Sequence, residues 1–216
     1  MLISKKHKVI FVHINKTGGT SLNQLLCGRG NHGRETIKFN MHHHAPAWMI
    51  KEKLDEEHPN MWDEYEKISM VRNPYSWQVS MYEFIKAESW HGDSRLIRKM
   101  TFKEYLEYFI GDGQLLPINN GRRKDDLNPF YMSQSKYIYN DDNNLMVDTV
   151  MKLESFQDDF NTLCEKIPSI GCKDVLHVNK TKHDDYKTYY EDTTIKKMVQ
   201  EIFQDDFKNF NYSTDL

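Results

Sequence analysis

The chain of 216 residues has few cysteines and no excess of positive charge. Its three cysteines, Cys27, Cys164 and Cys172, are an odd number without C-x-x-C spacing, which is typical of a reducing compartment and argues against a disulfide scaffold. Lysine and arginine number 29 against 32 aspartate and glutamate residues, so the net charge is −3. This balance excludes the overall basic field of a non-specific nucleic-acid binder. Any anion site must therefore be local.

Long hydrophobic runs are also missing. The N-terminal apolar run extends only from Val9 to Val12, and no later stretch approaches the roughly 20 apolar residues that span a bilayer. We therefore expect a cytoplasmic protein without a signal peptide or membrane span, with secretion through a segment outside this sequence as the alternative. The length predicts a single domain over residues 1–216, which needs no metal or disulfide to hold its core.

Predicted strands alternate with predicted helices along the chain. Short β-branched and aromatic runs predict strands at residues 8–14, 67–71, 137–139 and 148–153. Apolar residues at helical spacing predict further helices, which begin after the glycines at 18–19 and near Pro46 and cover 76–88, 101–110, the residues after Ser155, and 193–207. The predicted fold class is therefore α/β, with a parallel sheet flanked by helices.

Several helix starts carry capping signals. Thr101 and Glu104 have the spacing of a capping box, and Ser155 is a candidate cap for the helix that follows it. Thr20 or Ser21 is a candidate cap for the first helix. Aromatic residues at helical spacing, such as Trp77, are expected to lie in the core.

The strongest motif lies between the first predicted strand and the first predicted helix, where residues 16–21 read KTGGTS. Paired glycines let the backbone approach a ligand, the helix N-terminus adds positive potential, and lysine and hydroxyl groups complete an anion cradle. Because Lys16 precedes the glycines, the motif is not a Walker A loop. It predicts a phosphate site, with a plain glycine turn and a solvated lysine as the alternative.

A second motif, VRNPYSWQVS, contains Arg72 at the end of a predicted strand and Ser80 inside the next helix. Arginine can bind phosphate through two parallel hydrogen bonds, and the serine hydroxyl could reach the same group. The alternative is an arginine that caps local carbonyl groups and a serine on the helix surface.

Together these motifs resemble sulfotransferases that use 3′-phosphoadenosine 5′-phosphosulfate. FVHINKTGGTSL is similar to the 5′-phosphosulfate loop, and RNPYSWQVSMY to the 3′-phosphate motif, of the carbohydrate branch that includes the heparan sulfate 2-O-sulfotransferases. The resemblance extends over most of the chain through QSKYIY, VMKLESFQDDF, HVNKT, DYKTYYED and DDFKNFNY. It implies a P-loop-like sulfotransferase fold and sulfuryl transfer to a hydroxyl acceptor, with 3′,5′-ADP as product and no metal requirement.

The resemblance also implies roles for individual residues. Lys16 would meet the bridging oxygen of the leaving phosphate, and Arg72 and Ser80 would hold the 3′-phosphate. The 5′-phosphate would be held by the backbone N–H groups of Thr17, Gly18, Gly19, Thr20 and Ser21 and by the Thr20 and Ser21 hydroxyls. Asn179, Lys180 and Thr181 match the loop that closes over the nucleotide, although a polar turn before a helix explains them equally well.

The acceptor hydroxyl needs a base, and His42, His43 and His44 precede Ala45-Pro46 at a position similar to that of the family's catalytic histidine. Histidine titrates closest to neutral pH. In an extended segment His42 and His44 would share a face while His43 points away, so we expect His44, and next His42, to be the base. The alternatives are a glutamate base, solvated loop histidines, and a zinc site, although three consecutive residues cannot all reach one tetrahedral ion.

Residues Arg122, Arg123 and Lys124 form the densest basic cluster, within a glycine- and asparagine-rich stretch at 111–129. Beside an active site such a cluster would attract sulfated or carboxylated glycans, and elsewhere it would be a solvated turn. The resemblance favours a saccharide acceptor, with lipids and small metabolites as alternatives, and no nucleic-acid partner.

Two other functions compete with sulfuryl transfer. A nucleotide-dependent kinase or NTPase would need magnesium, but the sequence lacks both the Walker A glycine order and a clear strand-end aspartate. A non-catalytic nucleotide-binding protein is expected to lack Lys16 or every candidate base, and both are present. The sequence therefore favours an enzyme.

Overall fold

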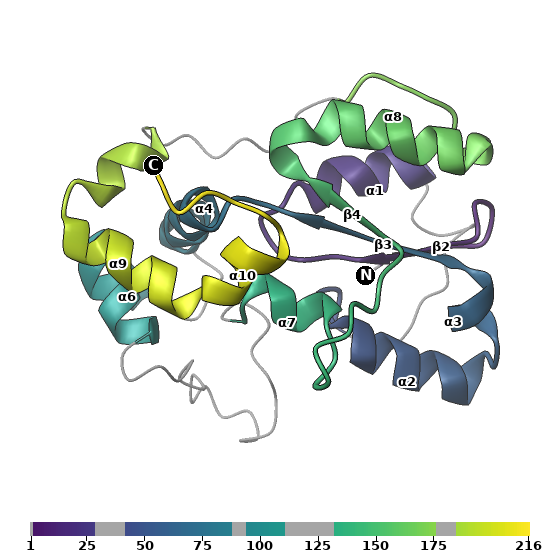
Figure 1. Ribbon diagram of the computed structural model, residues 1–216, viewed down its shortest axis with the longest axis horizontal. Helices are drawn as coiled ribbons and strands as arrows, with labels where there is room; N and C mark the ends of the chain where they lie inside the picture. Colours follow the sequence, from purple (N-terminus) through teal and green to yellow (C-terminus); the bar gives the residue numbers. More distant parts are fainter. Residues whose placement is uncertain (1, 29–41, 88–93, 111–131, 176–184) are drawn as a thin grey trace. The chain divides into compact units, whose positions relative to one another are not determined.

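The computed structural model describes residues 2–28, 42–87, 94–110, 132–175 and 185–216 (Figure 1). The chain divides into two compact units. The first comprises Met1–Arg72 and Gln134–Asn179, and the second comprises Asn73–Ser133 and Lys180–Leu216. The single domain over residues 1–216 stays a prediction.

A four-stranded sheet lies in the first unit, in the order β1 (Leu2–Ser4), β2 (Val9–Val12), β3 (Glu66–Val71) and β4 (Thr149–Lys152). Strand β1 is antiparallel to β2, whereas β2, β3 and β4 are parallel to one another. The predicted α/β class with a mostly parallel sheet is confirmed, and β1 is an additional strand at the edge of the sheet.

Helices cover both faces of this sheet. Helices α1 (Gly19–Cys27) and α8 (Phe156–Lys166) pack on one face, and α2 (Ala47–Glu57) and α7 (Gln134–Ile138) lie on the other (Figure 1). The short helices α3 (Met61–Glu64), η3 (Leu153–Ser155) and η4 (Pro168–Ile170) complete the described part of this unit. The core under α1 and α8 contains Val9, Phe11, Leu22, Leu26, Ile68, Met70, Met151, Phe160 and Leu163. Because side chains alternate along a strand, Ile10 and Val12 point to the opposite face, and both are also fully buried.

The predicted strand at residues 137–139 is wrong, because residues 134–138 form helix α7. Tyr137 and Ile138 are completely buried. A short apolar run that is buried all round does not distinguish a strand from a helix by its periodicity. Only Tyr139 keeps strand character, in an isolated bridge to Leu145.

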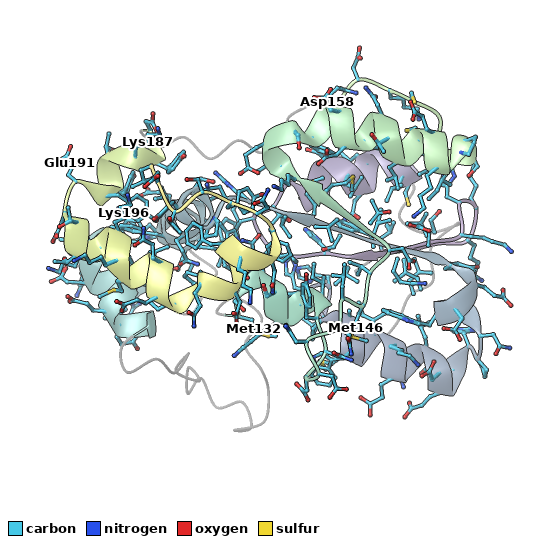
Figure 2. All side chains as sticks on the ribbon, in the orientation of Figure 1. Met132, Met146, Asp158, Lys187, Glu191 and Lys196 are labelled. Atoms are coloured by element: carbon cyan, nitrogen blue, oxygen red, sulfur yellow. The ribbon has the colours of Figure 1, made fainter. Side chains whose placement is uncertain are left out.

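Helix α8 begins without the predicted serine cap. The Ser155 hydroxyl donates to Oδ2 of Asp159 at 2.9 Å instead of accepting a helix N–H group. The same oxygen accepts the Lys152 N–H group at 2.6 Å, so Asp159 connects the helix to the end of β4. Asp158, also in the first turn, projects away from the sheet (Figure 2). Two carboxylates in this turn stabilise the helix through its dipole.

The second unit contains α4 (Pro74–Ala87), α5 (Ser94–Ile97), α6 (Phe102–Ile110), η5 (Tyr186–Tyr190), α9 (Thr193–Ile202) and α10 (Gln204–Asn209). The helix predicted at 193–207 is therefore divided at Phe203. Trp77 is completely buried with its ring edge-to-face against Phe203, with 5.6 Å between the ring centroids. Its expected place in the core is confirmed. In the described parts of the chain, no helix is long and apolar enough to cross a membrane.

The predicted capping box at the start of α6 is confirmed. Oε2 of Glu104 accepts the Thr101 N–H group at 2.7 Å, and the Glu104 N–H group donates to the Thr101 hydroxyl at 3.3 Å. The hydrogen bonds from Thr101 lower the pKa of Glu104, because they favour the ionised carboxylate.

Candidate functional site

The segments that follow β2, β3 and β4 lie at the same end of the sheet, because the carboxyl ends of parallel strands lie together. The loop after β2 leads through Lys16 into α1, Arg72 follows β3, and Leu153 follows β4. Nη1 of Arg72 donates to the Lys16 carbonyl oxygen at 3.3 Å. The structure therefore brings the two predicted cationic ligands of the first unit together.

Both glycines of the loop occupy positions that have no room for a side chain. Gly18 has a φ of +88°, and a Cβ there would lie 2.7 Å from Cδ1 of Leu153 and 3.2 Å from Sδ of Met70. A Cβ at Gly19 would lie 2.0 Å from Nε2 of His13, whose ring covers this residue. The first turn of α1 therefore reaches the sheet edge as bare backbone, which is what close approach of a phosphate group requires.

The start of α1 differs from the predicted serine or threonine cap. Gly18 is the N-cap residue and makes no side-chain cap bond, and the Ser21 N–H group donates to the Gly18 carbonyl oxygen at 3.0 Å. The first N–H groups of a helix precede any intrahelical acceptor. The N–H groups of Gly19 and Thr20 are therefore the donors that the start of this helix could offer to an anion. Thr20 is exposed, whereas Ser21 is buried.

Lys16 has a left-handed backbone conformation, with a φ of 60°. Such a conformation is unfavourable for a residue with a Cβ, and it changes the chain direction between β2 and α1. The loop is held from inside, because the Thr17 hydroxyl donates to the Ile14 carbonyl oxygen at 2.9 Å. Lys16 and Arg72 are both half-buried.

Several predicted site residues lie elsewhere. Ser80 is in α4, in the second unit, and is buried. The clusters Arg122, Arg123 and Lys124, and Asn179, Lys180 and Thr181, lie outside the described residues. The assignments of all these residues stay predictions.

Residues 42–45 form a turn, not the expected extended segment. The Ala45 N–H group donates to the His42 carbonyl oxygen at 3.0 Å and closes the turn. The three rings are neighbours, with centroid distances of 4.5 Å from His42 to His43, 4.1 Å from His43 to His44 and 5.6 Å from His42 to His44. The predicted alternation of faces is wrong, because side chains alternate along a strand and not around a turn. His44 is buried, whereas His42 and His43 are exposed.

Hydrogen bonds distinguish the proton positions of His44 and His42. Nδ1 of His44 lies 2.8 Å from the His13 carbonyl oxygen, which can only accept, so Nδ1 carries the proton and Nε2 is the basic nitrogen. The His44 backbone N–H group donates to Nδ1 of His42 at 3.2 Å. Neutral His42 therefore carries its proton on Nε2, and its basic nitrogen is the one that already accepts this bond.

Burial makes His44 and His13 weakly basic. It lowers the pKa of His44 to about 3, and the nearby His43 and His42 add repulsion, although the bond to the His13 carbonyl group opposes the shift. Burial and His44 likewise hold the pKa of His13 well below its usual value. Both imidazoles are therefore neutral near pH 7. Among the residues that the structure describes, no group of three or more histidine, cysteine, aspartate or glutamate side chains is placed to hold a metal ion.

No motif in the sequence assigns a role to Gln134, the first residue of α7. Its side-chain amide accepts the Arg72 N–H group and donates to the Arg72 carbonyl oxygen, each at 2.8 Å. The only sequence signal was its place in the segment QSKYIY. This segment resembles the sulfotransferases, but the resemblance assigns it no function.

The low pKa of His44 predicts that the protein loses stability in acid. With a pKa of about 3 when folded and roughly 6.5 when unfolded, His44 takes up a proton on unfolding, so this stability is lost as the pH falls between those values. From pH 7 to pH 5 this group should remove about 2 kcal/mol from the free energy of unfolding. Urea unfolding measures the loss.

His44→Gln, whose amide can still donate to the His13 carbonyl group, should lose about 2 kcal/mol less over this interval than the unaltered protein. His58→Gln, at the other end of α2, is the matched control and should behave like the unaltered protein. Equal losses of stability in all three proteins would contradict the low pKa of His44.

A comparison with known protein families matches residues 1–213 to the Sulfotransferase family. Searches of curated proteins and of solved structures gave no significant match. The matched range includes the glycine loop, Arg72 and the histidine turn. This chain is therefore a member of the sulfotransferase family, whose activity is sulfuryl transfer.

Proposed function

We propose that the protein transfers a sulfuryl group from 3′-phosphoadenosine 5′-phosphosulfate to a hydroxyl group. The observation that carries this proposal is the loop at which bare backbone at Gly18 and Gly19 lies beside Lys16 and Arg72. Helix N–H donors and two cationic side chains fit the phosphate groups of this donor. When bound, the donor supplies an activated sulfuryl group and a phosphate leaving group.

Lys16 is the proposed stabiliser of the leaving phosphate. Negative charge grows on the bridging oxygen during transfer, and a positioned cation lowers the energy of that state. The 5′-phosphate would bind the loop backbone from Thr17 to Ser21, chiefly at the Gly19 and Thr20 N–H groups, and the Thr20 and Ser21 hydroxyls. Positioning and electrostatics would then supply most of the catalysis.

Arg72 is the proposed ligand of the 3′-phosphate, the group that distinguishes this donor from the ordinary adenosine nucleotides. Its guanidinium group provides several N–H donors in a planar fork, which suits phosphate oxygens. Ser80, Asn179, Lys180 and Thr181 keep the binding roles that their motifs imply.

His44 is the proposed base for the acceptor hydroxyl. Its neutral form with Nε2 unprotonated is the state that a base requires, whereas the turn occupies the basic nitrogen of His42. With a pKa of about 3, the His44 imidazole is a weak base in the protein without bound donor. Negative charge of a bound donor favours the protonated imidazole and would raise this pKa toward neutrality.

The proposed acceptor is a saccharide, as in the carbohydrate branch that includes the heparan sulfate 2-O-sulfotransferases. Arg122, Arg123 and Lys124 are the proposed contacts to acidic groups of that acceptor. We also propose that both units belong to one catalytic domain that acts in the cytoplasm. The family match over residues 1–213, which includes parts of both units, supports the single domain.

Nucleotide binding tests the proposed donor. In thermal unfolding, 3′,5′-ADP should stabilise the protein more than 5′-ADP or Mg-ATP, because only 3′,5′-ADP carries the 3′-phosphate. A ligand at a hundred times its Kd adds about 2.7 kcal/mol to the free energy of unfolding. Equal or absent shifts with 3′,5′-ADP would remove the proposal, and a larger shift with Mg-ATP would favour a kinase or NTPase.

Lys16→Met tests the stabiliser of the leaving group. The variant keeps the alkyl stem but loses the cation, so turnover should fall roughly a hundredfold or more, as when one transition-state donor is removed. Lys6→Met, in the exposed turn between β1 and β2, is the control and should keep normal turnover. Near-normal turnover of Lys16→Met in a labelled-donor assay would refute the role.

His44→Ala and His42→Asn together test the base. His44→Ala should lose turnover and keep its affinity for 3′,5′-ADP, which titration calorimetry measures. His42→Asn should remain active, because the asparagine Oδ1 can replace Nδ1 as acceptor of the His44 N–H group. The reverse ranking, an active His44→Ala and an inactive His42→Asn, would identify His42 as the base.

A further inference from the structure

We infer that Gln134 is a positioning residue that sets the geometry of the anion site through Arg72. Its side chain is completely buried. The amide oxygen accepts the Arg72 N–H group and the amide nitrogen donates to the Arg72 carbonyl oxygen, each at 2.8 Å. This inference rests on the proposed function, in which Arg72 and Lys16 bind the donor.

The two bonds act as a strand partner beyond the end of β3. The sheet pairing of β3 with β4 ends at Val71 and Lys152, one residue before Arg72. Backbone polar groups away from water need hydrogen-bond partners, and Gln134 supplies a donor and an acceptor to the same residue. With both its N–H and C=O groups held, the Arg72 backbone has a restricted orientation, and its side chain leaves the sheet edge in a defined direction.

The direction of Arg72 affects Lys16 in turn. Nη1 of Arg72 donates to the Lys16 carbonyl oxygen at 3.3 Å, and Lys16 has the unfavourable left-handed conformation. A hydrogen bond to this carbonyl group favours that orientation of the peptide. Unfavourable backbone conformations persist where surrounding contacts hold them, and they are concentrated at functional sites. One buried amide thus supports the backbone of Arg72 directly and, through the Arg72 guanidinium group, the backbone of Lys16.

Side-chain chemistry limits which residue could do this. Glutamate offers an acceptor but, when ionised, no donor, and asparagine is one methylene shorter. Methionine is close to glutamine in length and can form neither bond. Glutamine is therefore suited to hold both backbone groups of Arg72 from the first turn of α7.

The test is a double-mutant cycle on nucleotide affinity. Titration calorimetry compares 3′,5′-ADP and 5′-ADP on the unaltered chain, Gln134→Met, Arg72→Met and the double variant. Gln134→Met should bind 3′,5′-ADP roughly tenfold more weakly, because a misplaced ligand loses much of its effect. In the Arg72→Met background the same substitution should have no further effect, since it acts through the guanidinium group.

Asp148→Ala is the matched control. Asp148 also bonds the backbone of β3, through the Lys67 N–H group at 2.8 Å, but at the opposite end of the strand. The Asp148→Ala substitution should lower the unfolding temperature of the protein without changing its preference for 3′,5′-ADP over 5′-ADP. A loss of the preference in Asp148→Ala equal to that in Gln134→Met would show a general effect of strand stability and overturn the inference.

The outcomes separate this inference from the proposed function. If the unaltered protein does not prefer 3′,5′-ADP, the proposed function fails and the inference fails with it. If it does, but folded Gln134→Met binds normally or weakens binding equally in the Arg72→Met background, only the inference is overturned. Should Gln134→Met not fold, Gln134→Glu decides, because it keeps the acceptor for the Arg72 N–H group and should show a smaller loss of the same kind.

Discussion

The site depends on the close approach of α1 to the edge of the sheet, which the missing side chains of Gly18 and Gly19 allow. Leu153 and Met70 fill the space beside Gly18, and the His13 ring fills the space beside Gly19. A Cβ at either residue would push the helix away from β2 or displace these neighbours. The same packing turns the first N–H groups of α1 toward the region beyond the strand ends.

The electrostatics of the site follow from this arrangement. In a chain with a net charge of −3, Lys16 and Arg72 concentrate positive charge at one loop, joined by a hydrogen bond. His13 and His44 add no positive charge near neutral pH, because burial lowers the pKa of both imidazoles. In the proposed function, a phosphate group would meet these two cationic residues and the helix N–H groups, and the neutral His44 imidazole would take the acceptor proton.

Features with a local origin were predictable. The strand, glycine loop and helix at residues 8–26 follow from neighbouring residues, as does the capping box of Thr101 and Glu104. Two of the errors concern segments that also contact residues far away in the sequence. Residues 137–139 were expected as a strand because an apolar run has no clear period, whereas residues 134–138 form a helix that packs against α2. The histidine triplet was expected to be extended, but a turn closed by Ala45 gathers its rings, and His44 donates to the carbonyl group of His13, 31 residues away.

Residue order alone determined the kind of chemistry: a lysine before paired glycines at the start of a helix, an arginine after a second strand, and a histidine triplet. The tertiary structure decided how these groups work together. Gln134 holds Arg72 across 62 residues of sequence, and Arg72 holds Lys16 across 56. The carbonyl group of His13, 31 residues before His44 in the sequence, decides which nitrogen of the His44 ring carries the proton. Hydrogen bonds between such distant residues depend on the folded path of the backbone, and no local pattern of side chains encodes that path.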